Sequence, residues 1–243
     1  MNLNQAENNL LTQIQGARAS RKTAASQAEA VGVELEGAYR IQAALGEKRE
    51  LRGYKFGLIS PAKQAQMKIS SPIYGRVYAE MLLKSPVHLS QFIQPRMEPE
   101  LAVVLRNDLP AQALPEAARL AVAGVFLGVD FLDSIWEGYR FNIAEVVADN
   151  ASGGGFLLGE RRLSEPFTGA LRLYLNGELL TEGPLESLGD IGERLSWLSE
   201  KVGGLRAEYV IFLGSPAAVL PAKPGRLELR GPQGSVLSAI VET

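Results

Sequence analysis

Apolar residues follow two different patterns along the chain, and the change falls near residue 50. In the first part, Leu10, Leu11 and Ile14 recur at helical spacing among Ala, Gln and Glu residues. From residue 51 onward, apolar runs are short and are interrupted by Gly, Pro and Ser, which is typical of strands and turns. We therefore predict a helical region over residues 1–50 and a β-rich domain over residues 51–243.

The β-rich part carries the patterns of several strands and three helices. Ser60 and Pro61 indicate a helix start, because Ser is a good N-cap and Pro suits the first helical position. Asn176-Gly177 is a strong hairpin signal between two apolar runs. The predicted strands cover residues 54–59, 101–105, 123–131, 156–158, 171–175, 178–181, 209–213, 226–230 and 236–241, and the predicted helices cover residues 60–67, 115–121 and 190–202. This mixture predicts an α+β fold.

Residues 149–155 read Asp-Asn-Ala-Ser-Gly-Gly-Gly and predict a glycine-rich turn ahead of the strand at 156–158. Glycine adopts positive φ and lets the backbone approach a neighbour closely, so the glycines are expected to form the turn. The Gly-Lys-Ser/Thr end of a phosphate-binding loop is absent, so a nucleotide is not expected here.

Composition removes several classes of function. The formal net charge of the 243 residues is -2, which leaves no basic excess for binding nucleic acid. The absence of cysteine excludes disulfides and thiol catalysis and fits a cytoplasmic protein. No apolar run reaches the roughly 18 residues of a membrane span. The N-terminus lacks a signal-peptide pattern, and we expect no membrane partner.

A single histidine, His88, further narrows the chemistry. Ser-His-Asp and Cys-His catalysis both need a histidine beside the nucleophile, and His88 lies in a stretch typical of a surface or loop. General acid–base chemistry must then come from carboxylates, lysine, tyrosine or metal-bound water.

Glu98 and Glu100 are the first candidates for such chemistry. If their segment is a strand, the period of two places both side chains on one face, roughly 7 Å apart. Two carboxylates on one face repel each other, so they require a cation between them or water around them. Hard oxygen ligands favour Mg²⁺, Mn²⁺ or Ca²⁺. The alternative is a pair of solvated glutamates at a strand entrance.

Four motifs occur in a fixed order. They are Tyr-Lys-Phe-Gly-Leu at 54–58, Pro-Ile-Tyr-Gly at 72–75, Gln-Pro-Arg-Met-Glu-Pro-Glu-Leu at 94–101 and Val-Val-Ala-Asp-Asn-Ala-Ser at 146–152. Together they resemble the 2-keto-4-pentenoate hydratase and 4-oxalocrotonate decarboxylase group of the fumarylacetoacetase superfamily. The resemblance implies that superfamily's fumarylacetoacetase-C-terminal-like mixed β-roll, with helices outside it and residues 51–243 as the catalytic domain.

The resemblance also implies a metal site. The superfamily's Glu-x-Glu ligands fall on Glu98 and Glu100, its third acidic ligand on Asp130 and its lysine on Lys55, and the implied cofactor is Mg²⁺ or Mn²⁺. Asp130 also ends a strongly apolar run, where an unpaired carboxylate would be costly. The hydratase group usually has glutamate at this third position, so Asp130 is more similar to the wider superfamily, which includes acylpyruvate hydrolases.

The activity implied by the resemblance is that of a divalent-metal-dependent lyase acting on a 2-oxo acid. We expect hydration of a 2-hydroxypenta-2,4-dienoate-type substrate to a 4-hydroxy-2-oxo acid, as in aromatic meta-cleavage catabolism, with Lys55 offsetting charge or moving a proton. Asn150 and Ser152 are expected to bind the substrate carboxylate or position water, although both are also ordinary turn residues. A 4-oxalocrotonate-type decarboxylase, an acylpyruvate-type hydrolase and a non-catalytic partner subunit are the alternatives. The family leads us to expect a homo-oligomer, and a complex with a related decarboxylase or hydratase is a further prediction.

Overall fold

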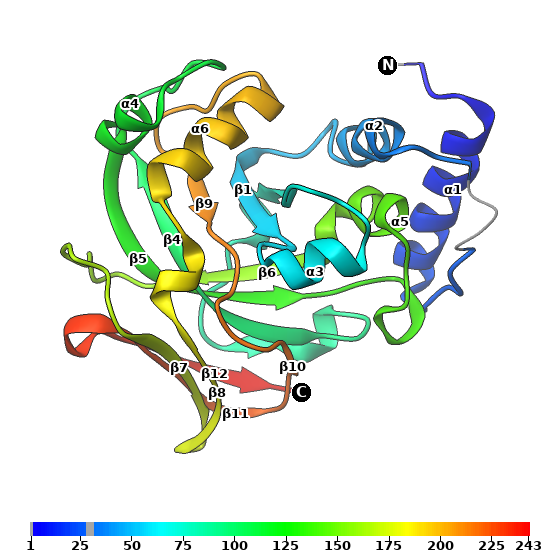
Figure 1. Cartoon of the computed structure of the whole chain (residues 1–243). Helices are drawn as coiled ribbons and strands as arrows, with labels where there is room; N and C mark the ends of the chain where they lie inside the picture. The colour runs from blue at the N-terminus through cyan, green and yellow to red at the C-terminus, as the bar shows by residue number, and fades with distance from the viewer. Residues whose placement is uncertain (1, 28–31) are drawn as a thin grey trace.

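The computed structural model describes residues 2–27 and 32–243 of the chain (Figure 1). Among these residues the strands form two sheets, of seven and five strands. The larger sheet has the order β2 (Ile73–Tyr78), β1 (Leu51–Gly57), β9 (Val210–Phe212), β4 (Arg96–Leu105), β5 (Val122–Leu132) and β6 (Gly153–Leu158), with β10 (Leu220–Pro221) added to β4. The smaller sheet has the order β3 (Val87–His88), β12 (Val236–Glu242), β11 (Gly225–Arg230), β7 (Ala170–Leu175) and β8 (Glu178–Pro184).

The helices lie outside these sheets, as Figure 1 shows. They are α1 (Gln5–Ser20), α2 (Leu35–Leu45), α3 (Pro61–Gln66), α4 (Pro115–Leu120), α5 (Ile143–Ala148) and α6 (Ile191–Val202). In the described residues, six short 3₁₀ turns also occur between these elements: η1 (Ala79–Met81), η2 (Leu89–Gln91), η3 (Glu137–Tyr139), η4 (Asn150–Ser152), η5 (Leu185–Leu188) and η6 (Pro232–Gly234). The predicted α+β class is confirmed, although α5 had no counterpart among the predicted helices. None of the helices in the described residues is both long and apolar enough to cross a membrane.

The larger sheet curls until its two ends meet. Beyond the end strand β2, the N–H of Leu83 donates to the carbonyl of Phe156 in the opposite end strand β6, at 2.8 Å. The curl gives the sheet an inner face, on which the rings of Phe156 and Phe212 pack with centroids 4.6 Å apart. Residue 128, beside these rings, is a glycine; any Cβ there would lie 2.7 Å from the Phe212 ring.

The outer face of the same sheet forms the main hydrophobic core. Alternate residues of β4 and β5 point outward and pack against the apolar face of the smaller sheet; they include Met97, Leu101, Val103, Val129 and Phe131, opposite Leu171, Leu173, Leu227 and Leu229. A strand buried on both faces reads as a continuous apolar run, which is how β5 appears in the sequence. The inner-face residues of β4 and β5 are therefore held in register by the packing behind them.

Strand β4 begins earlier than predicted, at Arg96 rather than at residue 101. Proline normally interrupts a central strand, because it cannot donate a ladder hydrogen bond. On the side of β4 opposite β5, β9 pairs with residues 102–104 and β10 pairs with residues 96 and 97. Pro99 lies between them, where β4 has no strand partner on that side among the described residues, although it pairs with Val129 of β5 on the other side. The longer strand therefore contains both Glu98 and Glu100.

The glycine-rich turn was placed wrongly. The residues with positive φ are Asn150 (53°), Ala151 (51°) and Ser152 (56°), whereas the three glycines begin strand β6. Close packing explains the difference, because a Cβ on Gly154 would lie 2.5 Å from a carbonyl oxygen of β5 and one on Gly155 would lie 2.6 Å from the Leu83 side chain. Three consecutive non-glycine residues in this region are strained, and such strain is concentrated at functional sites.

The N-terminal helices share a second core with α5. Leu10 and Ile14 of α1 and Ile41 of α2 pack with Trp136 and Val147. The predicted boundary between residues 1–50 and 51–243 stays a prediction, and residues 1 and 28–31 of the first region lie outside the described part of the chain. The shared core joins the helical region to the segment that precedes the turn at 150–152.

We predict that Phe156→Ala lowers the free energy of unfolding by about 3–5 kcal/mol, because it empties a buried aromatic position on the inner face. Urea unfolding followed by circular dichroism measures the change. As a control, Leu120→Ala removes a side chain that is 76% exposed and should cost less than about 0.5 kcal/mol. A loss in Phe156→Ala no larger than in the control would contradict the packed inner face.

Candidate metal centre

Strand register brings the three predicted acids together. Glu98 of β4 lies directly opposite Asp130 of β5, and Glu100 follows two residues later on the same face. Lys55 of β1 reaches this face across β9, where Phe212 pairs with Lys55 on one side and with Ala102 on the other. All four side chains therefore point to the inner face of the curled sheet.

These side chains are withdrawn from solvent. Glu100 and Asp130 are fully buried, Glu98 is 7% exposed and Lys55 is 1% exposed. One carboxylate oxygen from each acid lies within 4.8 Å of one from each of the others. The Lys55 Nζ lies 2.5 Å from Asp130 Oδ2. The alternative of solvated glutamates at a strand entrance is therefore wrong.

Burial and mutual repulsion shift the pKa values of this cluster. Burial raises the pKa of Glu100 well above its usual range, and the charges of Asp130 and Glu98 add to the rise. Burial also raises the pKa of Asp130, to about 7, although Lys55 lowers it. Burial alone would lower the pKa of Lys55, but the charges of the three carboxylates raise it. With all three carboxylates ionised, the cluster would carry more negative charge than Lys55 can balance.

Two oxygens of the cluster are available to a cation. Glu100 Oε2 accepts from the N–H of Gly214 at 2.8 Å, but Glu100 Oε1 and Asp130 Oδ1 have no hydrogen-bond partner among the described residues. Buried polar atoms normally have a partner, so these oxygens indicate an absent ligand. A set of three carboxylates suits a hard divalent ion such as Mg²⁺ or Mn²⁺, and the donor set fits the predicted cofactor.

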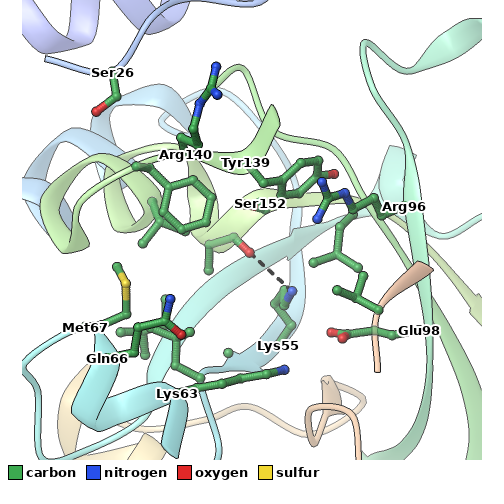
Figure 2. Close-up of a pocket in the computed structure, with 18 of the residues that line it drawn as sticks. Ser26, Lys55, Lys63, Gln66, Met67, Arg96, Glu98, Tyr139, Arg140 and Ser152 are labelled. Atoms are coloured by element: carbon green, nitrogen blue, oxygen red, sulfur yellow. Dashed lines mark hydrogen bonds between the residues drawn. The ribbon is translucent and has the colours of Figure 1, made fainter. Parts of the chain in front are cut away.

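A cavity of about 830 Å³ opens over the cluster. Lys55, Glu98 and Ser152 line it, and Figure 2 shows the hydrogen bond from Lys55 to the carbonyl of Ala151, which measures 3.2 Å. Positive side chains stand around the rest of the wall; they are Lys63, Arg96 and Arg140. Ala25 and Ser26, from the segment after α1, complete one side.

The turn residues Asn150 and Ser152 lie differently with respect to this cavity. Ser152 lines the cavity, is 2% exposed, and its hydroxyl has no hydrogen-bond partner among the described residues. The amide of Asn150 instead binds the main chain of β2, accepting from the N–H of Arg76 at 2.7 Å and donating to its carbonyl at 2.9 Å. Substrate binding stays a prediction for both, and the contacts favour it for Ser152.

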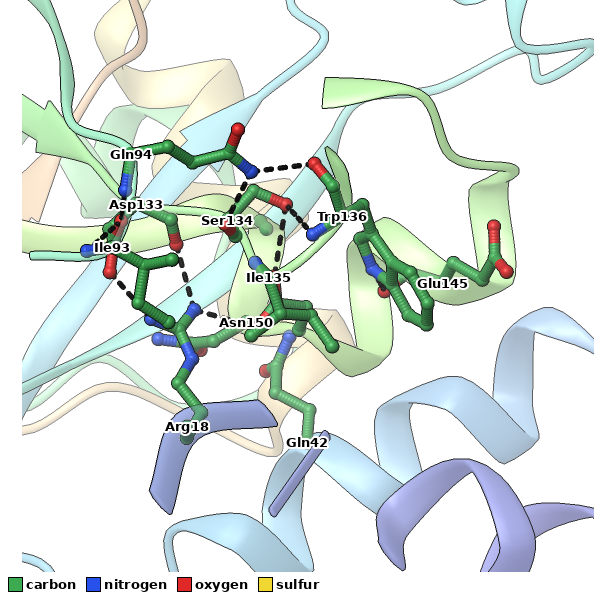
Figure 3. A network of polar contacts seen from close by, with 12 residues as sticks. Arg18, Gln42, Ile93, Gln94, Asp133, Ser134, Ile135, Trp136, Glu145 and Asn150 are labelled. Carbon is green, nitrogen blue, oxygen red and sulfur yellow. Dashed lines mark hydrogen bonds and ion pairs between the residues drawn. The ribbon is translucent and has the colours of Figure 1, made fainter. Parts of the chain in front are cut away.

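Sequence reasoning missed a polar network behind the turn, which Figure 3 shows. Arg18 of α1 reaches Asp133 and Asp149, with nitrogen–oxygen distances of 2.8 and 2.7 Å. Both carboxylates are buried. No local pattern links these residues, because more than a hundred positions separate Arg18 from either partner. The available signals were Asp149 within the Val-Val-Ala-Asp-Asn-Ala-Ser motif and the polar Asp133 just after an apolar run, and neither of them points to Arg18.

Comparison with known proteins agrees with this geometry. The profile of the fumarylacetoacetate (FAA) hydrolase C-terminal family matches residues 55–236. The chain belongs to this family. The match contains the lysine and the three acids, and it leaves α1 and α2 outside. The resemblance seen in the four motifs is confirmed, as is the implied fumarylacetoacetase-like fold.

Similar members of the family include both kinds of enzyme expected from the motifs. A 4-oxalocrotonate decarboxylase of a Pseudomonas species is 36% identical over 184 residues, which cover 71% of each chain. A 2-keto-4-pentenoate hydratase of Paraburkholderia phymatum is 31% identical over 234 residues, which cover 88% of each chain. Among solved structures, the 4-oxalocrotonate decarboxylase of Pseudomonas putida G7, complexed with magnesium and adipate, has a TM-score of 0.86 at 26% identity, covering 99% of this chain and all of that one.

We predict that Glu100→Gln weakens binding of Mn²⁺ while raising the melting temperature of the metal-free protein, because it removes a ligand and also one of three mutually repelling charges. Calorimetric titration with MnCl₂ measures the affinity, which should fall by at least about tenfold to a hundredfold. Thermal unfolding with and without Mn²⁺ measures the stability. Glu116→Gln, on the exposed surface of α4, should change neither property. Retention of Mn²⁺ binding by folded Glu100→Gln would remove Glu100 from the ligand set.

Proposed function

We propose that the chain is a divalent-metal-dependent lyase that hydrates a 2-hydroxypenta-2,4-dienoate-type acid to a 4-hydroxy-2-oxo acid. One observation carries this proposal: three buried carboxylates, two of which have oxygens without a hydrogen-bond partner, lie beside Lys55 at the base of a cavity. The names of the similar hydratases and decarboxylases support the same substrate class. We assign Glu98, Glu100 and Asp130 to the metal, Lys55 to catalysis and Ser152 to substrate binding.

A divalent cation bound here would act as a Lewis acid on the carbonyl of a 2-oxo acid and stabilise the enolate form. Lys55 lies between Asp130 and the Ala151 carbonyl, which fixes its amine at the wall where the substrate would lie. Its charge opposes the negative charge that develops on the substrate oxygen. The Ser152 hydroxyl is free to donate to the substrate carboxylate or to hold the water that adds.

The hydration itself requires two proton movements and one water. A proton is added to the terminal carbon of the dienoate as the 2-hydroxyl loses its proton, which gives a conjugated 2-oxo acid. Water then adds its oxygen to C4 and a proton to C3. We assign a proton-transfer role to Lys55, because among the cavity-lining residues it is the amine that contacts the acidic cluster.

A decarboxylase is the second candidate, and the positive wall of the cavity favours it. The Arg96 guanidinium lies over the Tyr139 ring at the cavity (Figure 2), and its central carbon is 3.9 Å from the ring centroid. Arg140 contacts Glu137 at 3.8 Å, but neither Arg96 nor Lys63 makes an ion pair with a described carboxylate. A dicarboxylic 2-oxo acid would offer them a second carboxylate. Loss of CO₂ from that end would use the same enolate form.

The remaining alternatives gain less support. A hydrolase of acylpyruvates would need a base for water, and His88 is exposed on β3, 3.4 Å from Glu242 and outside the cavity lining. A non-catalytic subunit would not need the free carboxylate oxygens and lysine to be kept together. We also propose a cytoplasmic homo-oligomer, with a complex with a related decarboxylase or hydratase as a further possibility. Light scattering of the purified protein tests the oligomer.

We predict that the Mn²⁺-loaded protein converts 2-hydroxypenta-2,4-dienoate, so that the absorbance of the dienoate falls, without releasing CO₂. Release of CO₂ from 4-oxalocrotonate would instead identify the decarboxylase. Lys55→Met should lower kcat by about 10²–10⁴-fold on whichever substrate is used, because it removes the proton-transfer group. Lys48→Met, at an exposed position, should leave kcat unchanged. If wild-type protein with bound metal turns over neither acid, the proposed function is wrong.

We also predict that Arg96→Met distinguishes substrates by their second carboxylate. The KM for a dicarboxylic substrate should rise by about 10- to 100-fold, because one charge-assisted hydrogen bond is lost. The KM for the monocarboxylic dienoate should change by less than about twofold. Arg206→Met, at an exposed position, serves as the control. Equal effects on both substrates would show that Arg96 does not read the second carboxylate.

A further inference from the structure

Arg18 contacts no residue of the metal cluster, yet it joins α1 to two segments that line the cavity, through Leu132 at the end of β5 and Val146 of α5. Its side chain is one-third exposed and extends from α1 to the loop after β5 and to the end of α5. One terminal nitrogen binds Asp133 Oδ2, while the other binds both the Asp133 carbonyl and Asp149 Oδ1, at 2.7 Å each. The planar guanidinium makes all three contacts at once, which a lysine amine cannot reproduce in the same geometry.

The two aspartates pass this constraint to the strands of the site. Asp133 Oδ1 accepts from the N–H groups of Ile93 and Gln94, both at 2.9 Å, just before β4 begins. Asp149 Oδ2 accepts from the N–H of Ile135 at 2.9 Å. Arg18 thus ties the start of the strand with Glu98 and Glu100 to the segment that follows Asp130.

The same residues hold the strained turn. The N–H of Asp133 donates to the Ser152 carbonyl at 2.8 Å, and the N–H of Ser152 donates to the Asp149 carbonyl at 3.0 Å. Between these anchors, the Ala151 carbonyl accepts from Lys55. Positive φ at three consecutive residues persists only when the surroundings enforce it. The side chain of Asn150 ties the turn to β2, and the residues bound to Arg18 supply the anchors at Asp133 and Asp149.

We propose that Arg18 is a positioning residue, which acts through Asp133 and Asp149 to hold the turn that orients Lys55 and Ser152 at the cavity. The inference rests on the proposed function, because it concerns the lysine assigned to catalysis. It also assigns to the helical region, outside the residues matched by the family profile, a part in building the site.

Arg40 offers a matched control within the same helical region. Like Arg18 it is a partly exposed arginine that forms an ion pair with a buried carboxylate, in this case Glu7. Both partners lie in the helical region, on α1 and α2. Removing Arg40 leaves one buried carboxylate without its ion-pair partner and removing Arg18 leaves two, so both substitutions should destabilise the fold, Arg18→Ala by more. Only Arg18 is connected to the turn.

The experiment compares wild type with Arg18→Ala, Arg18→Lys and Arg40→Ala. Hydrogen exchange followed by mass spectrometry should show exchange at residues 149–153 accelerated by at least about tenfold in Arg18→Ala and unchanged there in Arg40→Ala. In the Mn²⁺-loaded proteins, kcat of Arg18→Ala should fall by about a hundredfold. KM should rise as well, because the loosened turn carries Ser152, whereas the Kd for Mn²⁺ should stay within about twofold of wild type. Arg18→Lys should recover part of kcat, because lysine restores the positive charge but lacks the planar guanidinium that makes all three contacts.

The outcomes separate this inference from the proposed function. Wild-type kcat in folded Arg18→Ala, or unchanged exchange at residues 149–153, would overturn the positioning role. Accelerated exchange spread evenly over the chain, matched by Arg40→Ala, would make Arg18 a general stabiliser and would also overturn it. Inactivity of wild type on both substrates would refute the proposed function, and the local exchange result would still decide whether Arg18 holds the turn.

Discussion

The charge balance at the inner face of the large sheet is the constraint on which the rest of the structure depends. Three carboxylates and the amine of Lys55 are removed from water there. With the carboxylates ionised, Lys55 cancels one negative charge and leaves two, which a divalent cation matches. Without the cation, protons can compensate, as the raised pKa values of Glu100 and Asp130 indicate. Metal binding and the stability of this face are therefore linked.

The register of the strands brings the three carboxylates and Lys55 together, and the core behind the sheet fixes that register. Glu98 lies opposite Asp130 because the neighbouring pair, Met97 and Phe131, packs against the smaller sheet. A slip of one residue would turn the glutamates into that apolar contact and Met97 into the cavity. Side chains on paired strands are also held more rigidly than side chains on loops, which suits a site that must place several ligands around one ion.

The acidic cluster could be predicted from the sequence, whereas the network around Arg18 could not. The period of two placed Glu98 and Glu100 on one face, and the motifs added Lys55 and Asp130. Arg18 had no such signal, because an arginine on an amphipathic helix has the same pattern whether it is solvated or bound to a distant carboxylate. The turn at 150–152 was misplaced for a different reason. Glycine tolerates positive φ in general. Here, however, the glycines are needed in a strand, because a Cβ on Gly154 or Gly155 would collide with β5 or with Leu83.

The two parts of the chain contribute differently to the site. The family-matched residues supply the acids and the lysine, while the segment after α1 supplies part of the cavity wall. That segment is anchored: Ser26 donates to the buried Glu145 carboxylate at 2.6 Å, and Ala24 exchanges main-chain hydrogen bonds with Ile135 and Glu137. Function on a shared fold is set by what surrounds the common core. In the proposed function, the sheet would supply the metal and lysine chemistry, and the wall around it would select among 2-oxo acids.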